Sequence, residues 1–237
     1  FSVTDPLHKP PSFVVEEYKK YAPTIGKAIN GAGGFGGLRE LRGTIYQWAK
    51  TKHAIKSKTF TENNIIGTNG GAEAIFSAIQ IIADGERNGY IVLPNPADPI
   101  YETAARIAGL EPIFCSTMTS QQPTYRDVTE EQWPNVKAVV VNSPADPYGA
   151  DLPVLTWEFL LKQSEEFGFF ILSDERLNTI HRGKPPAGLL EMADSNENPD
   201  MNRCLVVNDL TFRSNLAGMP SGFIAGDREF IKKANIY

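Results

Sequence analysis

The stretch from Leu205 to Gly226 reads LVVNDLTFRSNLAGMPSGFIAG and gives the strongest indication of the fold. It opens with an apolar run, carries Gly218 and Pro220 in its middle, and closes with the apolar sequence GFIAG. This order is typical of a strand, a structured loop and a second strand. The segment therefore predicts a loop that forms part of a site.

Apolar runs and helical patterns alternate through the rest of the chain. The expected strands cover residues 64–67, 90–94, 111–115, 136–142, 169–175, 205–207 and 222–226. The expected helices cover residues 38–55, 72–83, 103–108, 155–167 and 189–193, a first helix N-capped by Ser12, a short one within 116–135 and a last one capped by Asp227. This alternation predicts a three-layer α/β fold, with a mostly parallel sheet, helices on both faces and a site at the carboxyl ends of the strands.

The composition is that of an ordinary globular chain that can bury a core. The 237 residues are 41% hydrophobic and 22% charged, with a formal net charge of -5 and a pI of about 5.3. Lys and Arg are scattered, so the charge predicts no nucleic-acid partner. The apolar runs are too short to span a bilayer, so we expect a soluble protein without membrane insertion.

The cysteines and histidines show no metal-binding pattern. Cys115 and Cys204 lie inside apolar runs, where buried strand residues are more common than a disulfide or a metal pair. His8, His53 and His181 are far apart and lack the spacing of metal ligands. We expect no metal site and a reducing compartment, either cytoplasm or an organelle matrix.

Residues 1–37 are expected to form an N-terminal arm, and residues 38–237 one large domain. The arm ends in the segment 30–37, NGAGGFGG, which has glycine at five of its eight positions. No Lys-Ser/Thr follows these glycines, and they do not lie between a strand and a helix. A phosphate-binding P-loop is therefore not predicted here.

Five short motifs resemble those of class I aminotransferases that depend on pyridoxal phosphate (PLP). The motifs are Thr68-Asn69-Gly70, Pro94-Asn95-Pro96, Gly149, Ser173-Asp174-Glu175 and Arg213-Ser214-Asn215. The resemblance covers nearly the whole chain and is nearest to succinyldiaminopimelate aminotransferase. It implies the large domain of the PLP-transferase fold. It also implies a C-terminal small domain with the arginine for the substrate carboxylate, and because the chain stops at Tyr237 we expect that domain to be missing.

The resemblance also locates the groups that bind the cofactor, and most are replaced. Phe212 takes the place of the Schiff-base lysine, Asp209 that of a phosphate-binding serine, and Pro220 that of a phosphate-binding arginine. Ala32 takes the place of the tyrosine that reaches the phosphate in the partner subunit. The turn that holds the phosphate is Asn69-Gly70-Gly71 here, which keeps backbone donors but lacks the threonine hydroxyl.

The residues around the cofactor ring are altered in the same way. Asp98 takes the place of the stacking aromatic, Asp146 that of the asparagine that donates to the ring oxygen, and Leu177 that of the tyrosine that bonds it. Asp174, which the resemblance pairs with the pyridine nitrogen, is retained.

These replacements predict that the chemistry is lost. An aminotransferase without its lysine cannot form the internal aldimine or move the substrate's alpha proton. Asp98, Asp146, Asp174 and Asp209 are expected to surround the pocket and to repel a phosphate. We therefore expect no catalytic residue, no cofactor-binding residue and no bound PLP.

The leading hypothesis is a catalytically inactive pseudoenzyme, descended from an aminotransferase, that serves as a structural or assembly subunit. A missing small domain would expose apolar surface, so other protein subunits are expected as partners, in a hetero-assembly or a dimer through the ancestral interface. One alternative is a succinyldiaminopimelate-type aminotransferase completed by another chain that supplies lysine and arginine. Another is an acidic pocket that binds a cation or a basic peptide, unless its aspartates are solvated or bonded to loop N–H groups.

Overall fold

The computed structural model describes residues 6–24, 36–85 and 88–236. Most of the glycine-rich segment 30–37, including Ala32, lies outside these ranges. The expectation that Ala32 replaces a phosphate-binding tyrosine therefore concerns a residue that the structure does not describe.

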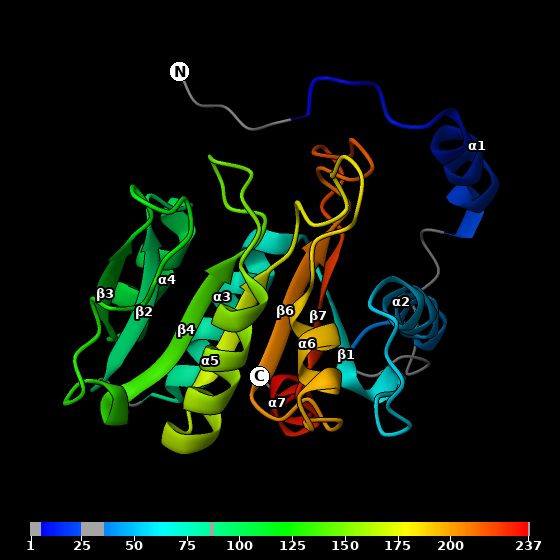
Figure 1. The fold of residues 1–237 in the computed structure, drawn as a ribbon. Coiled ribbons are helices and arrows are strands. Elements are labelled where there is room, and N and C mark those ends of the chain that lie inside the picture. The colour runs from blue at the N-terminus through cyan, green and yellow to red at the C-terminus, as the bar shows by residue number, and fades with distance from the viewer. Residues whose placement is uncertain (1–5, 25–35, 86–87, 237) are drawn as a thin grey trace.

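One seven-stranded sheet organises the molecule (Figure 1). Its strands are β1 (Ile65–Thr68), β2 (Tyr90–Asn95), β3 (Glu111–Ser116), β4 (Val136–Asn142), β5 (Phe170–Asp174), β6 (Cys204–Asp209) and β7 (Gly222–Gly226). They lie in the order β1-β7-β6-β5-β4-β2-β3. β7 runs antiparallel to both of its neighbours, β1 and β6, and the other pairs of strands are parallel. The predicted mostly parallel α/β sheet is thus confirmed.

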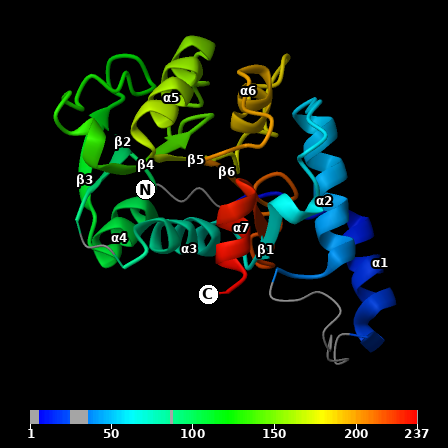
Figure 2. The same ribbon diagram turned by 90° about the horizontal axis from the view of Figure 1, so that it is seen from below.

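Helices cover both faces of this sheet (Figure 2). One face carries α2 (Arg39–Lys52), α5 (Val154–Phe167) and α6 (Leu189–Ser195), and the other carries α3 (Gly71–Ala83), α4 (Pro99–Ala108) and α7 (Arg228–Ala234). The two cores correspond to these layers: Trp157 and Phe169 pack in the first, and Ile75 and Phe230 in the second. Because β4 and β6 are covered on both faces, their residues are apolar almost throughout.

The main differences from the predicted elements are at helix starts. α4 begins at Pro99 rather than near residue 103, because Asp98 Oδ1 accepts a hydrogen bond from Ile100 N and caps the helix. Ser12 is not an N-cap: α1 (Ser12–Tyr21) follows Pro11 at that position and has no side-chain cap. Between residues 116 and 135 the only helical element is the 3₁₀ turn η3 (Trp133–Asn135). Asp227 caps α7 as predicted, through Phe230 N.

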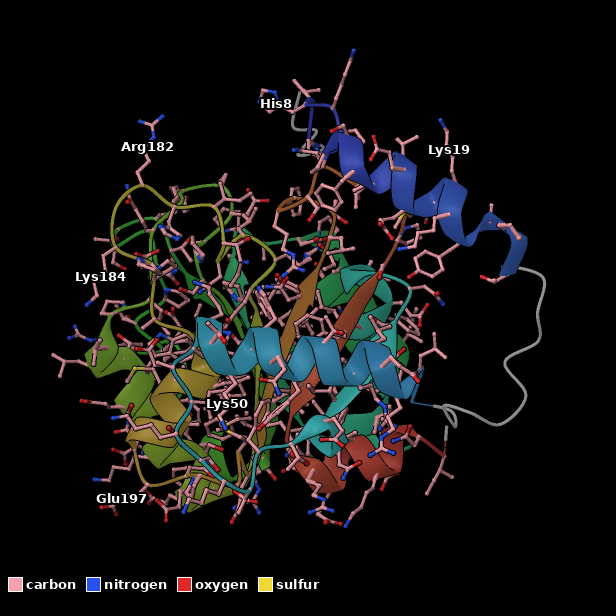
Figure 3. All side chains as sticks on the ribbon, turned by 90° about the vertical axis from the view of Figure 1, so that its right-hand side faces the viewer. His8, Lys19, Lys50, Arg182, Lys184 and Glu197 are labelled. Atoms are coloured by element: carbon pink, nitrogen blue, oxygen red, sulfur yellow. The ribbon has the colours of Figure 1, made fainter. Side chains whose placement is uncertain are left out.

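Helix α1 lies at the periphery of the layered body (Figure 3), where the Tyr18 hydroxyl contacts Met219. None of the residues of α1 is buried, and Lys19 points away from the body. A 3₁₀ turn, η1 (Ala22–Thr24), follows α1, and a second one, η2 (Glu62–Asn64), precedes β1. Among the described residues, every helix is too short or too polar to span a bilayer.

The loops that follow β4, β5 and β6 gather at the carboxyl ends of these strands, at the upper edge of the sheet in Figure 1. The N-terminus of α3 opens on the same edge, because α3 follows the parallel-running β1 after a short turn. Crevices at such edges are where open α/β sheets bind ligands. The polar residues of these loops therefore define the candidate site.

Candidate functional site

The centre of the site is an ion pair between Asp174 and Arg176. Asp174 is the last residue of β5, and only 1% of its surface is exposed. Arg176 Nη2 lies 2.7 Å from Asp174 Oδ2, and Arg176 Nε lies 2.9 and 3.0 Å from the two carboxylate oxygens. The Tyr101 hydroxyl donates to Asp174 Oδ2 at 2.5 Å. Both oxygens of the buried carboxylate are therefore engaged by the chain itself.

Arg176 also binds a second carboxylate, from α4. Its Nη2 lies 2.9 Å from Asp98 Oδ2, while the other oxygen of Asp98 caps the helix. The guanidinium thus bridges the end of β5 and the start of α4. Asp98 was expected to replace a stacking aromatic and to line an acidic pocket, and the structure shows that it caps α4 and pairs with Arg176.

The ion pair determines the ionisation of the groups around it. Burial alone would raise the pKa of Asp174, but the charge of Arg176 and the bonds from Arg176 and Tyr101 outweigh it and hold that pKa below its ordinary value. Burial and the Asp174 carboxylate raise the pKa of Tyr101 well above its ordinary value. At neutral pH the site therefore contains a charged carboxylate, a charged guanidinium and a neutral phenol.

The second feature of the site is the N-terminus of α3. Gly71 N donates to Asp209 Oδ2 at 3.0 Å, and the same carboxylate accepts from Thr211 N and Thr211 Oγ1, both at 3.0 Å. A helix N-terminus favours an anion. Here Asp209 provides that anion, so one of the backbone donors expected to remain in the turn is already used.

Glycines at positions 70 and 71 permit this close packing. A Cβ at Gly71 would overlap Arg176 Cδ and would lie 2.9 Å from Asp209 Oδ2. Gly70 has φ +93° and packs against Pro220, the residue expected in place of a phosphate-binding arginine. The turn therefore brings Arg176, Asp209 and Pro220 against the start of α3.

The space that remains is a cavity of about 50 Å³. It is lined by Asp98, Tyr101, Asn142, Asp146, Asp174, Arg176, Leu177 and Phe212. Three of the four predicted aspartates do meet here. Asp209 does not line this cavity, because it turns to α3 and Thr211. Burial and the carboxylates of Asp98 and Asp174 raise the pKa of Asp146, against the opposing effect of Arg176.

Sequence reasoning missed Arg176 and Tyr101. Four aspartates were expected to surround the pocket and to repel a phosphate, but Arg176 pairs with two of them, Asp98 and Asp174, and supplies a positive charge there. A signal was present, because Arg176 directly follows the Asp174-Glu175 pair at a strand end. The hypothesis of a pocket for an external cation loses its main premise, and the alternative of bonds to loop N–H groups holds for Asp98 and Asp209.

On the other face of the sheet, Glu175 is fully buried without a cation bound to it. Its Oε1 accepts from Leu189 N at 2.7 Å and from Ser173 Oγ at 3.1 Å. Its Oε2 has no hydrogen bond among the described residues and lies 3.7 Å from His53 Nε2. Burial raises the pKa of Glu175 to about 7 and lowers the pKa of His53 to about 4. The carboxyl is therefore largely protonated below neutral pH.

The remaining candidates stay separate. Cys115 and Cys204 are buried free thiols, as predicted. Within residues 6–24, 36–85 and 88–236, no group of three or more His, Cys, Asp or Glu side chains is placed to hold a metal ion.

An apolar groove of about 240 Å³ lies beside the site, between α2 and the strands β6 and β7. Leu41, Trp48 and Phe223 line it, and the Arg213 guanidinium lies 4.6 Å from the centre of the Trp48 ring. The frame residue Arg213 thus packs on an aromatic side chain at the edge of the site.

The sheet order, the crevice at the strand ends and the glycine turn before α3 define an open α/β protein with a candidate ligand site at the carboxyl edge of its sheet. The family "Aminotransferase class I and II" matches residues 1–236, and the chain belongs to this family.

Among curated relatives, the chain is similar to (5-formylfuran-3-yl)methyl phosphate transaminase of Methanocaldococcus jannaschii, with 27% identity over 83% of this chain and 48% of the relative. It is also similar to aspartate aminotransferase of Bacillus subtilis, with 25% identity over 92% of this chain and 51% of the relative. A probable N-acetyl-LL-diaminopimelate aminotransferase of B. subtilis is 24% identical over 83% of this chain and 47% of that protein. The chain spans about half the length of these relatives.

Solved structures agree with this assignment. An aminotransferase from Neisseria meningitidis superposes with a TM-score of 0.90 at 31% identity, over 99% of this chain and 59% of that one. The aminotransferase AspB from Helicobacter pylori gives a TM-score of 0.88 at 26% identity, over 99% of this chain and 61% of that one.

Family membership corrects one expectation. The prediction that no cofactor belongs to this chain is wrong at the level of the family, because the matched proteins are PLP-dependent aminotransferases. PLP is therefore the cofactor that the family assigns to this site. As the side chains lie, the cavity of about 50 Å³ and the Arg176 ion pair leave no room for its ring beside Asp174. A ring can reach that carboxylate only after Arg176 has moved.

Proposed function

We propose that this chain is a catalytically inactive member of the aminotransferase family that serves as a structural or assembly subunit. One observation carries the proposal: the groups that face Asp174 are Arg176 and Tyr101, and Phe212 lines the cavity at the position that the resemblance assigns to the catalytic lysine.

The lack of an amine is the chemical basis. Transamination needs an amine that bonds covalently to the cofactor and then moves the alpha proton. No lysine is among the described residues that line the cavity, and Phe212 has neither a nucleophile nor a base. Arg176 does not replace it, because a guanidinium paired with two carboxylates stays protonated.

An assembly role is supported by the exposed apolar side chains of α1. Phe13 is 62% exposed, Val15 50% and Tyr21 54%, on a helix without a buried residue. Apolar side chains gathered on one exposed element mark a surface for other proteins. Other subunits are therefore the proposed partners, in a hetero-assembly or in a dimer.

The enzymatic part is tested by trapping. The purified chain is incubated with PLP, reduced with borohydride and mapped by peptide mass spectrometry, and its turnover of amino donors is measured. We expect no turnover above the blank and no modified peptide from the site loops, residues 175–188 or 210–221. Turnover that co-purifies with the chain would overturn the proposal.

The alternative is a PLP-dependent aminotransferase, of the succinyldiaminopimelate type, completed by another chain. It is favoured by the retained frame: Asp174 is buried and charged, and the Gly70-Gly71 turn still opens α3. Native mass spectrometry of the protein from its source, followed by the same assay on the complex, separates the two. A stoichiometric complex without turnover supports the subunit, an active complex supports the alternative, and a solitary monomer contradicts both.

A further inference from the structure

We infer that the chain's own side chains occupy the ligand crevice: Arg176 takes the place of a cationic ring at Asp174, and Asp209 takes the place of an anionic group at α3. On this inference Arg176 is a plug, and a ligand enters only when the plug is displaced. The inference holds whether the chain is inactive or is completed by another chain, so it goes beyond the proposed function.

The cationic half rests on the geometry around Asp174. Three contacts of 2.7 to 3.0 Å join the Arg176 guanidinium to this carboxylate, and a fourth, of 2.9 Å, joins it to Asp98. A guanidinium is planar and binds carboxylates with fixed geometry, so it fills a flat slot much as a ring does. Only 14% of the Arg176 side chain is exposed. The buried carboxylate therefore has no free oxygen to offer to an incoming cation.

The anionic half rests on the start of α3, a helix of 13 residues. Its first amide, Gly71 N, donates to Asp209, a residue that is 4% exposed and whose carboxylate also accepts from Thr211. An incoming anion would meet a carboxylate where the helix otherwise offers a donor and a favourable dipole. The Asp174 carboxylate and the first amide of α3 are thus both bonded to groups of the chain itself.

Gly71 connects the two halves. A Cβ there would overlap Arg176 and crowd Asp209, so the missing side chain is what lets both groups pack against the helix. What remains is a cavity of about 50 Å³, whereas sites for small molecules are generally of about 300–1,000 Å³. The crevice is filled, although its fold and its buried carboxylate are those of a ligand site.

The first test compares PLP binding by wild type, Arg176→Ala and the matched control Arg106→Ala, measured by equilibrium dialysis. Arg106 pairs with Glu102 on the surface, away from the site. Its replacement by alanine removes one positive charge, as Arg176→Ala does. An internal competitor multiplies the apparent affinity by the fraction of chains in which the site is open, so we expect Arg176→Ala to bind at least about tenfold more tightly than wild type. Losing a cation would by itself weaken binding of an anionic ligand, so tighter binding identifies a plug. Equal or weaker binding by Arg176→Ala would overturn the inference.

Chemical rescue provides a second readout that does not involve activity. Methylguanidinium should raise the melting temperature of Arg176→Ala and compete with PLP there, and it should do neither in wild type or in Arg106→Ala. An equal response of all three proteins would count against the plug. Adding Asp209→Ser to Arg176→Ala should further tighten binding of inorganic phosphate, and unchanged phosphate binding would remove Asp209 from the inference.

A measurement on the wild-type chain decides the matter if Arg176→Ala fails to fold. The Arg176 Nε–H resonance is followed by NMR while PLP is added and its binding is measured in parallel. Binding that shifts this resonance supports the plug, as does an unchanged resonance without binding. Binding with the resonance unchanged would overturn the inference. None of these readouts is turnover, so their outcome is independent of whether the chain proves inactive.

Discussion

Asp174 ends β5 and Glu175 directly follows it, and their side chains lie on opposite faces of the sheet in opposite electrostatic states. Both are essentially inaccessible, at 1% and 0% exposure. Asp174 faces α4 and is bound by Arg176 and Tyr101. Glu175 faces α2 and α6, near His53 and Leu189. The pKa of Asp174 lies below its ordinary value, whereas that of Glu175 is raised to about 7.

The difference shows that burial alone does not decide whether a carboxyl is charged. Taken by itself, burial acts to raise the pKa of both groups. Only Asp174 has a cation in contact, and that cation more than offsets the effect of burial. The face that carries the crevice is therefore ionic and held closed by its own pairing, whereas on the opposite face Glu175, without a cation in contact, keeps its proton until the pH approaches about 7.

The largest expected effect comes from removing the cation. Arg176→Met leaves Asp174 buried and charged without a partner, and losing one member of a buried pair costs about 3–5 kcal/mol of unfolding free energy. Urea denaturation at pH 8 measures this cost.

The control for this variant removes both charges. Asp174→Asn together with Arg176→Met leaves no orphan carboxylate, so most of the lost stability should return. If the double variant is as unstable as Arg176→Met alone, packing of the arginine and not its charge holds this region together.

The next effect is a pH dependence on the Glu175 side. The pKa of Glu175 in the folded protein, about 7, lies above its ordinary value of 4.5, so between these pH values the folded protein keeps a proton that the unfolded chain has released. Stability from this group is therefore full below pH 4.5 and is lost as the pH rises to 7. Relative to Glu175→Gln, wild type should lose about 3 kcal/mol across this window and nothing further above it, at about 1.4 kcal/mol per pKa unit.

The comparison variant for this pH effect is His53→Gln. His53 has its pKa lowered to about 4, so its contribution has the opposite sign and is lost as the pH falls from 6.5 toward 4. If the difference between wild type and Glu175→Gln does not change with pH, then Glu175 is not held protonated in the folded protein.

Most of the fold could be predicted from the sequence because strand and helix patterns report burial directly. β4 and β7 have the predicted ends, and α5 and α6 agree within one or two residues. The start of α4 was placed too late because Asp98 was interpreted as a lost ring contact. Its capping role depends on a local hydrogen bond that hydrophobic periodicity does not report.

The site could be predicted only in part. Asp98, Asp146 and Asp174 meet because they follow parallel strands whose carboxyl ends share one edge. The plug could not be predicted, because the direction of the Arg176 side chain depends on the room left by Gly71, which is distant in sequence. Motif comparison therefore selected the positions at which cofactor contacts were expected, and it missed Arg176, the residue that fills the space.

A smaller effect is expected from the hydroxyl that completes the Asp174 contacts. Tyr101→Phe removes one hydrogen bond to a buried charged group and should cost about 1.5–3 kcal/mol in urea denaturation. Tyr125→Phe is the matched control, because the Tyr125 hydroxyl is also buried and has no hydrogen-bond partner among the described residues. It should be neutral or slightly stabilising, and a similar loss in both variants would show that the bond to Asp174 contributes little.

The smallest expected effect tests whether burial, and not ion pairing itself, makes the contribution of the Asp174–Arg176 pair to stability large. Arg106 and Glu102 form a pair of the same 2.7 Å length on the exposed surface of α4, with 61% and 44% of their side chains exposed. Water solvates both charges whether or not they meet, so Glu102→Gln should change the unfolding free energy by no more than about 0.5 kcal/mol. Measured beside Arg176→Met in the same buffer, a loss of comparable size in both variants would show that desolvation is not what separates the two pairs. The ionic crevice would then be no more strongly held than an ordinary surface contact.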